Sequence, residues 1–197
     1  HNQSRRQRQM CIRDRVKNYS TELSDIKICS GVYFSDERGS LKKAIHGDEI
    51  TMLMPNIREV LCTTSQKNVI RGLHYQEEPH QIKKFITCIK GEVLDIFVDI
   101  RKDSKTYGKH GVQKLTESDS LSVLIPEGFA HGFATLSKSS VVVYLQSENF
   151  NPEFDRSINP LSLDIDWRVE NPIISEKDKT AVNFIDCLLY TSPSPRD

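Results

Sequence analysis

Short strand-like runs, separated by turns at intervals of about ten residues, are the feature that most constrains how this chain folds. The clearest example is a hairpin in which residues 85–89 lead into the turn Lys90-Gly91 and residues 92–100 lead away from it. Aliphatic residues alternate along one face of the second arm, while Asp95 and Asp99 share the other face with two apolar residues. Alternation with a period of two indicates a strand with two distinct faces.

The rest of the chain repeats this pattern and favours a helix near its end. Gly and Pro turns separate the runs, and Ser175 followed by Glu176 and Asp178 has the composition of a helix start. Residues 41–57 are ambiguous, with a short helical turn and then a loop as the expectation. We therefore predict one mainly β domain, a sandwich or jelly-roll barrel, with a short C-terminal helix. The other predicted strands are residues 26–29, 32–34, 60–64, 69–75, 112–116, 121–125, 133–136 and 141–146.

Both ends of the chain resemble translated sequencing adapters. Residues 5–14 (RRQRQMCIRD) and residues 187–197 (CLLYTSPSPRD) match two companion adapters of a widely used transposase method. The alternative interpretations are a basic arm that binds nucleic acid and a Pro/Ser tail. We interpret residues 1–15 and 187–197 as adapter translation and residues 16–186 as a single domain.

Setting those ends aside changes the charge balance. The 27 Lys and Arg and 27 Asp and Glu of the whole chain fall to 21 and 25, a net charge near −4 that argues against a nucleic-acid partner. Three scattered cysteines remain, Cys29, Cys62 and Cys88, and an odd number argues against a disulfide framework. No apolar run approaches the roughly 20 residues that cross a bilayer. We expect a cytoplasmic protein that does not bind membranes.

A histidine and an arginine lie on the predicted strand 69–75. On a regular strand His74 and Gly72 point to one face, and Arg71 and Leu73 to the other. His131 lies in a Pro-x-Gly-x-x-His pattern, which matches the second motif of cupin barrels. For His74 alone, a half-buried histidine bonded to backbone is the ordinary interpretation.

Three further residues have ordinary explanations when they are considered singly. Lys84 begins an apolar strand, where a solvated lysine is the usual case. Tyr144 lies in an apolar run and fits a core tyrosine, and Asp178 near a helix start fits a contact with the helix dipole.

The order and spacing of these residues carry more information than any one of them. Lys84 lies ten residues after His74, Tyr144 lies thirteen after His131, and Asp178 ends the series. From about residue 31 to residue 178 the chain strongly resembles the dTDP-4-dehydrorhamnose 3,5-epimerase family. The resemblance implies a cupin-type jelly-roll β-barrel, an isomerase that needs no cofactor or metal, and a homodimer with exchanged N-terminal segments. It also implies a place in dTDP-rhamnose supply for polysaccharide biosynthesis.

The resemblance further implies catalytic roles for five residues. His74 is similar to the general base that removes a proton beside the sugar's C4 ketone, and Asp178 to its carboxylate partner. Tyr144 is similar to the acid that returns a proton from the opposite ring face. Lys84 and His131 match the groups that stabilise the enolate oxygen.

Residues for the rest of the substrate, a dTDP-linked sugar, are implied in the same way. Arg71 matches a diphosphate ligand, where a guanidinium fork suits phosphate oxygens. Arg38 matches an arginine that reaches the nucleotide of the neighbouring subunit, and Phe150 an aromatic residue that stacks on the thymine. The other expected substrate-binding residues are Phe34, Gln76 and Lys177.

The sequence departs from the family pattern around the site. A Gln-x-Asn pair usual in the family falls at Glu59 and Leu61, and a Trp-Asn-Asp segment is shortened to residues 158–162. An aromatic pair usual after Arg38-Gly39 is replaced by Ser40-Leu41. These departures are compatible with another nucleotide, another sugar, or epimerisation at C3 alone.

Three other functions stay open from sequence. A sugar 3,4-ketoisomerase characteristically has His-Ala-His where this chain has His74-Tyr75-Gln76, which disfavours it. A metal-dependent cupin oxygenase needs a His-x-His and Glu ligand set, whereas His74, His80 and His131 are the histidines available. A sugar-nucleotide-binding barrel without catalysis is the remaining alternative, of a different class.

Overall fold

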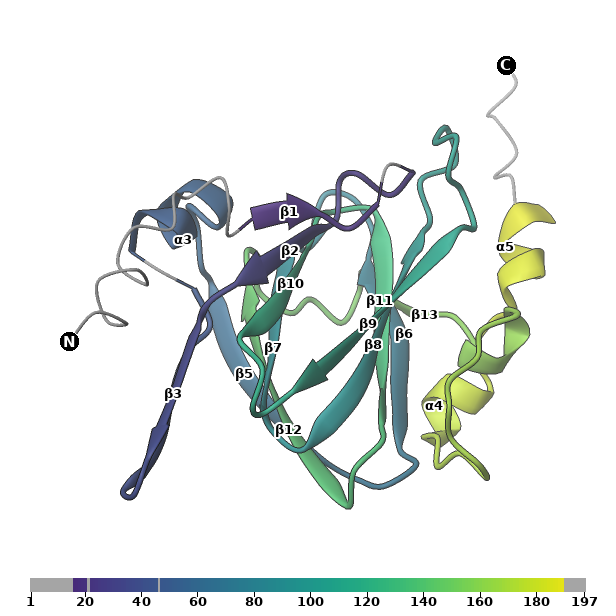
Figure 1. Ribbon diagram of the computed structural model, residues 1–197. Coiled ribbons are helices and arrows are strands. Elements are labelled where there is room, and N and C mark those ends of the chain that lie inside the picture. The colour runs from purple at the N-terminus through teal and green to yellow at the C-terminus, as the bar shows by residue number, and fades with distance from the viewer. Residues whose placement is uncertain (1–15, 21, 46, 190–197) are drawn as a thin grey trace.

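The computed structural model of this chain describes residues 16–20, 22–45 and 47–189, and within them two antiparallel sheets lie face to face (Figure 1). The first sheet has the order β1 (Val16–Asn18), β2 (Lys27–Ser30), β10 (Leu121–Ile125), β7 (Lys84–Lys90), β12 (Ser139–Gln146) and β5 (Glu59–Gln66). The second has the order β13 (Asp155–Ser157), β6 (Ile70–Gln76), β11 (Phe129–Thr135), β8 (Glu92–Asp99) and β9 (His110–Thr116).

The helices and a small hairpin lie outside these sheets. Strands β3 (Val32–Asp36) and β4 (Gly39–Lys43) pair with each other and extend away from the sheets (Figure 1). Helix α3 (Gly47–Leu53) follows them, and the C-terminal part contains the 3₁₀ helix η2 (Pro160–Ser162) and helices α4 (Glu176–Lys179) and α5 (Phe184–Leu189). None of the helices in the described ranges is long and apolar enough to cross a membrane.

The main core lies between the two sheets. Ile86, Val123 and Val142 of the first sheet pack there with Phe97 and Phe133 of the second, and all five are fully buried. The alternation seen in residues 92–100 explains the layering, because alternate β8 residues enter this core and the others enter a second cluster on the outer face. Both faces of β8 are therefore buried.

The C-terminal segment covers the outer face of the second sheet. Ile165, Trp167 and Ile174 pack on aliphatic residues of β6, β8 and β11, and the Trp167 indole donates a hydrogen bond to the Pro160 carbonyl at 3.0 Å. This packing brings α4 into contact with β6. Its packing places Asp178 beside β6.

The structure confirms the mainly β architecture and each predicted strand, with several corrections. The hairpin predicted for residues 85–100 is wrong, because the turn at Lys90-Gly91 leads from β7 in the first sheet to β8 in the second, and the two strands do not pair. The strand predicted at residues 133–136 is β11, which begins at Phe129, and the helix predicted near Ser175 is α4, with the Ser175 side chain accepting from the Asp178 amide. Strands β1, β4 and β13 and helix α5 were not predicted from sequence. Of the two proposed adapter segments, residues 1–15 and 190–197 lie outside the described residues, while residues 187–189 end α5.

Candidate active site

A cavity of about 270 Å³ opens between the sheets. Strands β5, β7 and β12 form one wall, and β6, β11 and β13 form the other, so the two walls come from different sheets. The residues that line it are Leu61, Thr63, Arg71, His74, Tyr75, Gln76, Ile82, Lys84, His131, Gly132, Tyr144, Gln146, Phe150, Asp155 and Lys177. All five residues expected to be catalytic lie in or at this cavity, Asp178 through its contact with His74.

An irregularity in β6 places Arg71 and His74 on the same side of the sheet. His74 pairs with His131 of β11, but Arg71 pairs with Phe133, so three steps on β6 match two on β11. Such an extra residue is a β-bulge, and it reverses the alternation of side chains beyond it. The sequence prediction that Arg71 and His74 face opposite ways was therefore wrong. Both line the cavity.

The bulge depends on a close approach of two glycines. Gly72 has a φ of +110°, and a Cβ atom built there would lie 2.6 Å from the Gly132 Cα. A Cβ atom on Gly132 would in turn lie 2.6 Å from the Arg71 carbonyl oxygen. Neither position has room for a side chain, so β6 and β11 meet closely just where their histidines enter the cavity.

His74 is held by a carboxylate from α4. Its Nε2 atom lies 2.6 Å from Asp178 Oδ1, and the Asp178 side chain is 5% exposed against 37% for His74. Burial alone would raise the pKa of Asp178, but hydrogen bonds from His74 and from the Gly72 backbone outweigh it and hold that pKa below its usual value. An ionised Asp178 fixes the proton of His74 on Nε2, so the other ring nitrogen, Nδ1, carries a lone pair.

His131 is held by a second, fully buried carboxylate. Its Nε2 atom lies 2.7 Å from Asp95 Oδ1, and neither side chain is more than 4% exposed. Burial lowers the pKa of His131 below its usual value, although Asp95 opposes that shift. His131 is therefore a fixed, neutral side chain in the cavity wall.

Lys84 and Tyr144 come from the opposite wall. The Lys84 ammonium donates to the His74 carbonyl at 3.1 Å, and burial lowers its pKa to about 8 against the opposing effect of Asp155 and Asp95. The ring centroids of Tyr144 and His131 are 5.8 Å apart in an edge arrangement, and burial raises the pKa of Tyr144 far above its usual value. Tyr144 thus keeps its proton throughout the physiological pH range.

The rim of the cavity holds the other polar groups. Lys177 and Asp155 form an ion pair across it, and Phe150 is 57% exposed beside them. Gln76 lies in the wall, where its amide donates to the His80 carbonyl at 2.7 Å and accepts from the Asn151 amide at 2.7 Å. Gln76 therefore anchors the loop that carries Phe150.

Two residues expected to bind substrate are not brought into this cavity. Phe34 and Arg38 lie on the β3–β4 hairpin, which extends away from the sheets (Figure 1). The Arg38 side chain is 85% exposed and pairs with Asp36. Substrate binding by Phe34 therefore stays a prediction, and so does the contact of Arg38 with the nucleotide of a neighbouring subunit.

Sequence reasoning missed several groups in the site. Asp95 had a detectable signal, since it is a charge on a strand face shared with apolar residues. Asp155 and Thr63 had none, because only the packing of β13 and β5 brings them to the cavity. Over the part of the chain that the structure describes, no cluster of three or more His, Cys, Asp and Glu side chains is arranged to hold a metal ion.

Comparison with known proteins places this chain among epimerases of nucleotide-linked sugars. The family model described as dTDP-4-dehydrorhamnose 3,5-epimerase matches residues 20–186, and the chain belongs to that family. A dTDP-4-dehydrorhamnose 3,5-epimerase of Shigella flexneri is 36% identical over 176 residues, which cover 84% of this chain and 94% of the relative.

Two further relatives bear on specificity. A dTDP-4-dehydrorhamnose 3-epimerase of Streptomyces niveus is 31% identical over 82% of this chain and 86% of its own length. The crystal structure of a dTDP-6-deoxy-D-glucose-3,5-epimerase from Legionella pneumophila in complex with dTDP-4-keto-L-rhamnose superposes with a TM-score of 0.78 at 32% identity, covering 85% of this chain and 91% of that one.

Proposed function

We propose that this chain inverts C3 and C5 of dTDP-4-dehydro-6-deoxy-D-glucose to give dTDP-4-dehydro-L-rhamnose. The observation that carries the proposal is the placement of a carboxylate-held histidine, His74, and a protonated tyrosine, Tyr144, on opposite walls of one cavity. Inversion of a carbon needs proton removal on one face and proton return on the other. The names of the relatives point to the same reaction.

The first step is removal of the proton beside the ketone. Neutral His74 takes this proton on Nδ1, and the electron pair of the C–H bond moves into an enolate whose negative charge lies on the C4 oxygen. Asp178 stabilises the imidazolium that results, because it already accepts the Nε2 proton. The substrate's own ketone is the electron sink, so the step needs no cofactor.

The enolate is stabilised and then reprotonated from the other side. Lys84 donates a hydrogen bond to the C4 oxygen, since a buried ammonium suits a developing negative charge, and His131, held by Asp95, lines the cavity with it. Tyr144 then gives its proton to carbon on the face away from His74. Tyr144 recovers a proton from solvent and the His74 imidazolium releases one to solvent, which restores both groups. One such cycle inverts C3 and a second inverts C5.

The nucleotide part lies at the rim in this proposal. Arg71, whose guanidinium donates to Ser65 Oγ at 2.9 Å, offers its remaining N–H groups to the diphosphate together with Lys177. Phe150 stacks on the base, and Gln76 holds that loop in place.

A homodimer completes the site. Phe34 and Leu41 pair across the β3–β4 hairpin and are 49% and 51% exposed, an apolar surface that suits contact with a second copy of the chain. In this arrangement Arg38 at the hairpin tip reaches the nucleotide in the cavity of the partner subunit. A cytoplasmic location accompanies the proposal, since Cys29, Cys62 and Cys88 are free thiols as a reducing compartment requires.

Deuterium uptake tests the proposal. Residues 16–186 are incubated with dTDP-4-dehydro-6-deoxyglucose in D₂O, and the C3 and C5 proton signals are followed by NMR. We expect exchange and inversion at both carbons, reduced about 10²–10⁴-fold by His74→Ala. His110→Ala, on an exposed position of β9, is the matched control and keeps the wild-type rate. Binding of the sugar nucleotide without exchange would instead support the non-catalytic binding protein.

Epimerisation at C3 alone, or of another nucleotide-linked 4-keto sugar, is the second candidate. Leu61 lies directly opposite Tyr144 in the pairing of β5 with β12, and Glu59 has a buried carboxylate oxygen without a hydrogen-bond partner among the described residues. Leu61 lines the cavity, and its apolar side chain beside the acid changes what the sugar meets there. Exchange at C3 without exchange at C5 would favour this candidate, and Leu61→Asn is then expected to increase exchange at C5.

A further inference from the structure

We infer that Lys42 is a positioning residue, which fixes the orientation of the β3–β4 hairpin and thereby the place of Arg38 in the partner's cavity. Residues 32–43, which form this hairpin, are its arm. The inference rests on the proposed function, because it assumes that the arm serves the site of a second copy. It assigns a role to a residue that does not line the cavity.

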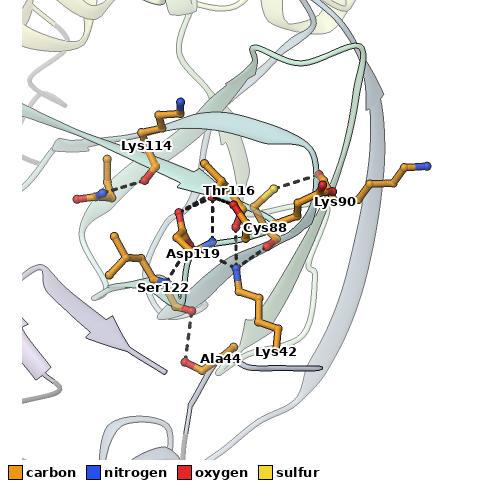
Figure 2. Close-up of polar contacts among 12 residues, drawn as sticks. Lys42, Ala44, Cys88, Lys90, Lys114, Thr116, Asp119 and Ser122 are labelled. Atoms are coloured by element: carbon orange, nitrogen blue, oxygen red, sulfur yellow. Dashed lines mark hydrogen bonds and ion pairs between the residues drawn. The ribbon is translucent and has the colours of Figure 1, made fainter. Parts of the chain in front are cut away.

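The ammonium group of Lys42 is surrounded by hydrogen-bond acceptors that lie outside the arm. It donates to the Cys88 carbonyl at 2.7 Å, to the Thr116 carbonyl at 2.8 Å and to Asp119 Oδ1 at 3.5 Å. Its side chain is 10% exposed. Figure 2 shows these three contacts converging on the one nitrogen atom. An ammonium group has three N–H donors, and here each has an acceptor.

These acceptors belong to both sheets. Cys88 lies on β7 of the first sheet and Thr116 ends β9 of the second, so Lys42 joins the two sheets where these strands approach each other. Asp119 is itself fixed, since its carboxylate accepts from the amides of Thr116 at 2.7 Å and Leu121 at 2.9 Å. Lys42 is therefore attached to a rigid part of the molecule.

The rest of the arm has little such support. One hydrogen bond holds the chain at each end of the arm. Before the arm, the Gly31 amide donates to the Ser120 carbonyl of the β9–β10 turn at 2.7 Å. After it, the Ala44 carbonyl accepts from the Ser122 hydroxyl of β10 at 3.4 Å. Beyond Lys42 the strands pair only with each other among the described contacts, and Arg38 lies at the exposed tip. The direction of the arm is thus set at its base.

The length of the arm amplifies any change at that base. A strand of five residues is about 16 Å long, so a tilt of about 10° displaces its tip by about 3 Å. A hydrogen bond to phosphate does not survive such a displacement. Loss of the Lys42 contacts should therefore weaken nucleotide binding through Arg38 and leave the chemistry at His74 and Tyr144 unaffected.

The experiment compares kcat and KM for the dTDP-linked sugar among matched variants. Lys42→Met keeps the apolar stem of the side chain and removes the ammonium, whereas Lys43→Met removes the same charge from the next, exposed position of β4. We expect Lys42→Met to raise KM about tenfold, as for the loss of about one charge-assisted hydrogen bond, with kcat within about twofold of wild type. Lys43→Met should change neither.

A double variant identifies the route of the effect. If Lys42 acts through Arg38, then Lys42→Met adds nothing to the KM of Arg38→Ala, because the group that it positions is already absent. Independent, multiplying effects on KM would overturn the inference, and so would an unchanged KM in Lys42→Met. If Lys42→Met does not fold, Lys42→Arg decides, since its larger head does not reproduce the three contacts; a wild-type KM there overturns the inference.

The two proposals fail in different ways. A wild-type protein without deuterium exchange at C3 or C5 contradicts the proposed function, and the inference about Lys42 falls with it. A wild-type protein that exchanges both protons, together with a Lys42→Met variant of unchanged KM, contradicts only the inference. Light scattering on both proteins shows whether the variant also alters the dimer, and a monomeric Lys42→Met variant with normal KM would likewise overturn it.

Discussion

His74 and His131 are directly paired across β6 and β11, yet each presents Nε2 to a different carboxylate. Asp178 comes from α4 and leaves His74 37% exposed, whereas Asp95 comes from β8 and leaves His131 4% exposed. Two histidines in adjacent positions thus have distinct environments. The exposed one can exchange protons with substrate and solvent, and the buried one holds a fixed hydrogen-bond geometry.

Asp178→Asn should reduce kcat about 10²–10⁴-fold with little change in KM. The amide offers His74 a donor as readily as an acceptor, so the ring is no longer held with its proton on Nε2 and cannot be stabilised as imidazolium. Steady-state kinetics measure the effect, with Asp166→Asn as the control on an aspartate whose side chain is 84% exposed. A variant that loses only substrate affinity would contradict the assigned role.

Tyr144→Phe should separate exchange from inversion. His74 remains able to remove a proton and to return deuterium on the same face, so the substrate should still incorporate deuterium in D₂O. Inversion should fall about 10²–10⁴-fold because the acid on the opposite wall is absent. NMR of the recovered sugar distinguishes retained from inverted carbons, and normal inversion in this variant would exclude Tyr144 as the acid.

Lys84 should give kcat/KM an alkaline limb near pH 8. Its pKa in the folded protein is about 8, and the ammonium form is required, so kcat/KM should decline about tenfold per pH unit above that value. Tyr144 does not contribute, since burial keeps its pKa far higher. Lys84→Arg keeps a permanent charge and should remove the limb while lowering the rate.

The lowered pKa of Lys84 also makes the stability of the folded protein depend on pH. Because the folded pKa of Lys84 lies below its unfolded value of 10.5, the cost of burying the charge is fully present below about pH 8 and diminishes as pH rises toward 10.5.

The kinetic prediction for Lys84 has a clear contrary outcome. If the alkaline limb of kcat/KM stays near pH 8 in Lys84→Arg, a group other than Lys84 causes that limb. Reactions without enzyme correct for spontaneous exchange at high pH.

His131 should make the protein less stable in acid. Its folded pKa is lowered, so the unfolded chain binds a proton at His131 near pH 6.5 that the folded protein does not bind. Stability is fully present above that pH and is lost as pH falls, by up to about 1.4 kcal/mol per unit. Urea unfolding of wild type and His131→Gln at pH 7.5 and 5.5 tests this, and an equal pH dependence in both would contradict it.

Local pattern was sufficient to predict most of the strands, but not how they pair. Both faces of β8 pack as the alternation of its residues indicates. The predicted hairpin was wrong, because β7 pairs with β10 and β12 whereas β8 pairs with β11 and β9 in the other sheet. β13 was missed because three residues carry no periodicity, and α5 because only tertiary contact, such as Phe184 on Tyr107, distinguishes it from a tail.

Several residues predicted for the site line one cavity, but their geometry was not predicted. Spacing and family resemblance identified His74, Tyr144 and Lys84, which come from three different strands. The common orientation of Arg71 and His74 depends on a bulge that no local pattern shows, because it arises from the meeting of β6 with β11. The partnership of His131 with Asp95 likewise depends on register between strands.

The contact between Gly72 and Gly132 sets a boundary for anyone who redesigns this pocket to accept new sugars. A library that varies either glycine would push apart the strands that carry both histidines, and most members would lose the reaction before gaining selectivity. Leu61 and Thr63 on β5 line the same space from the other sheet, away from that contact. Substrate scope is therefore best changed from the β5 side, with the histidine side left as it is.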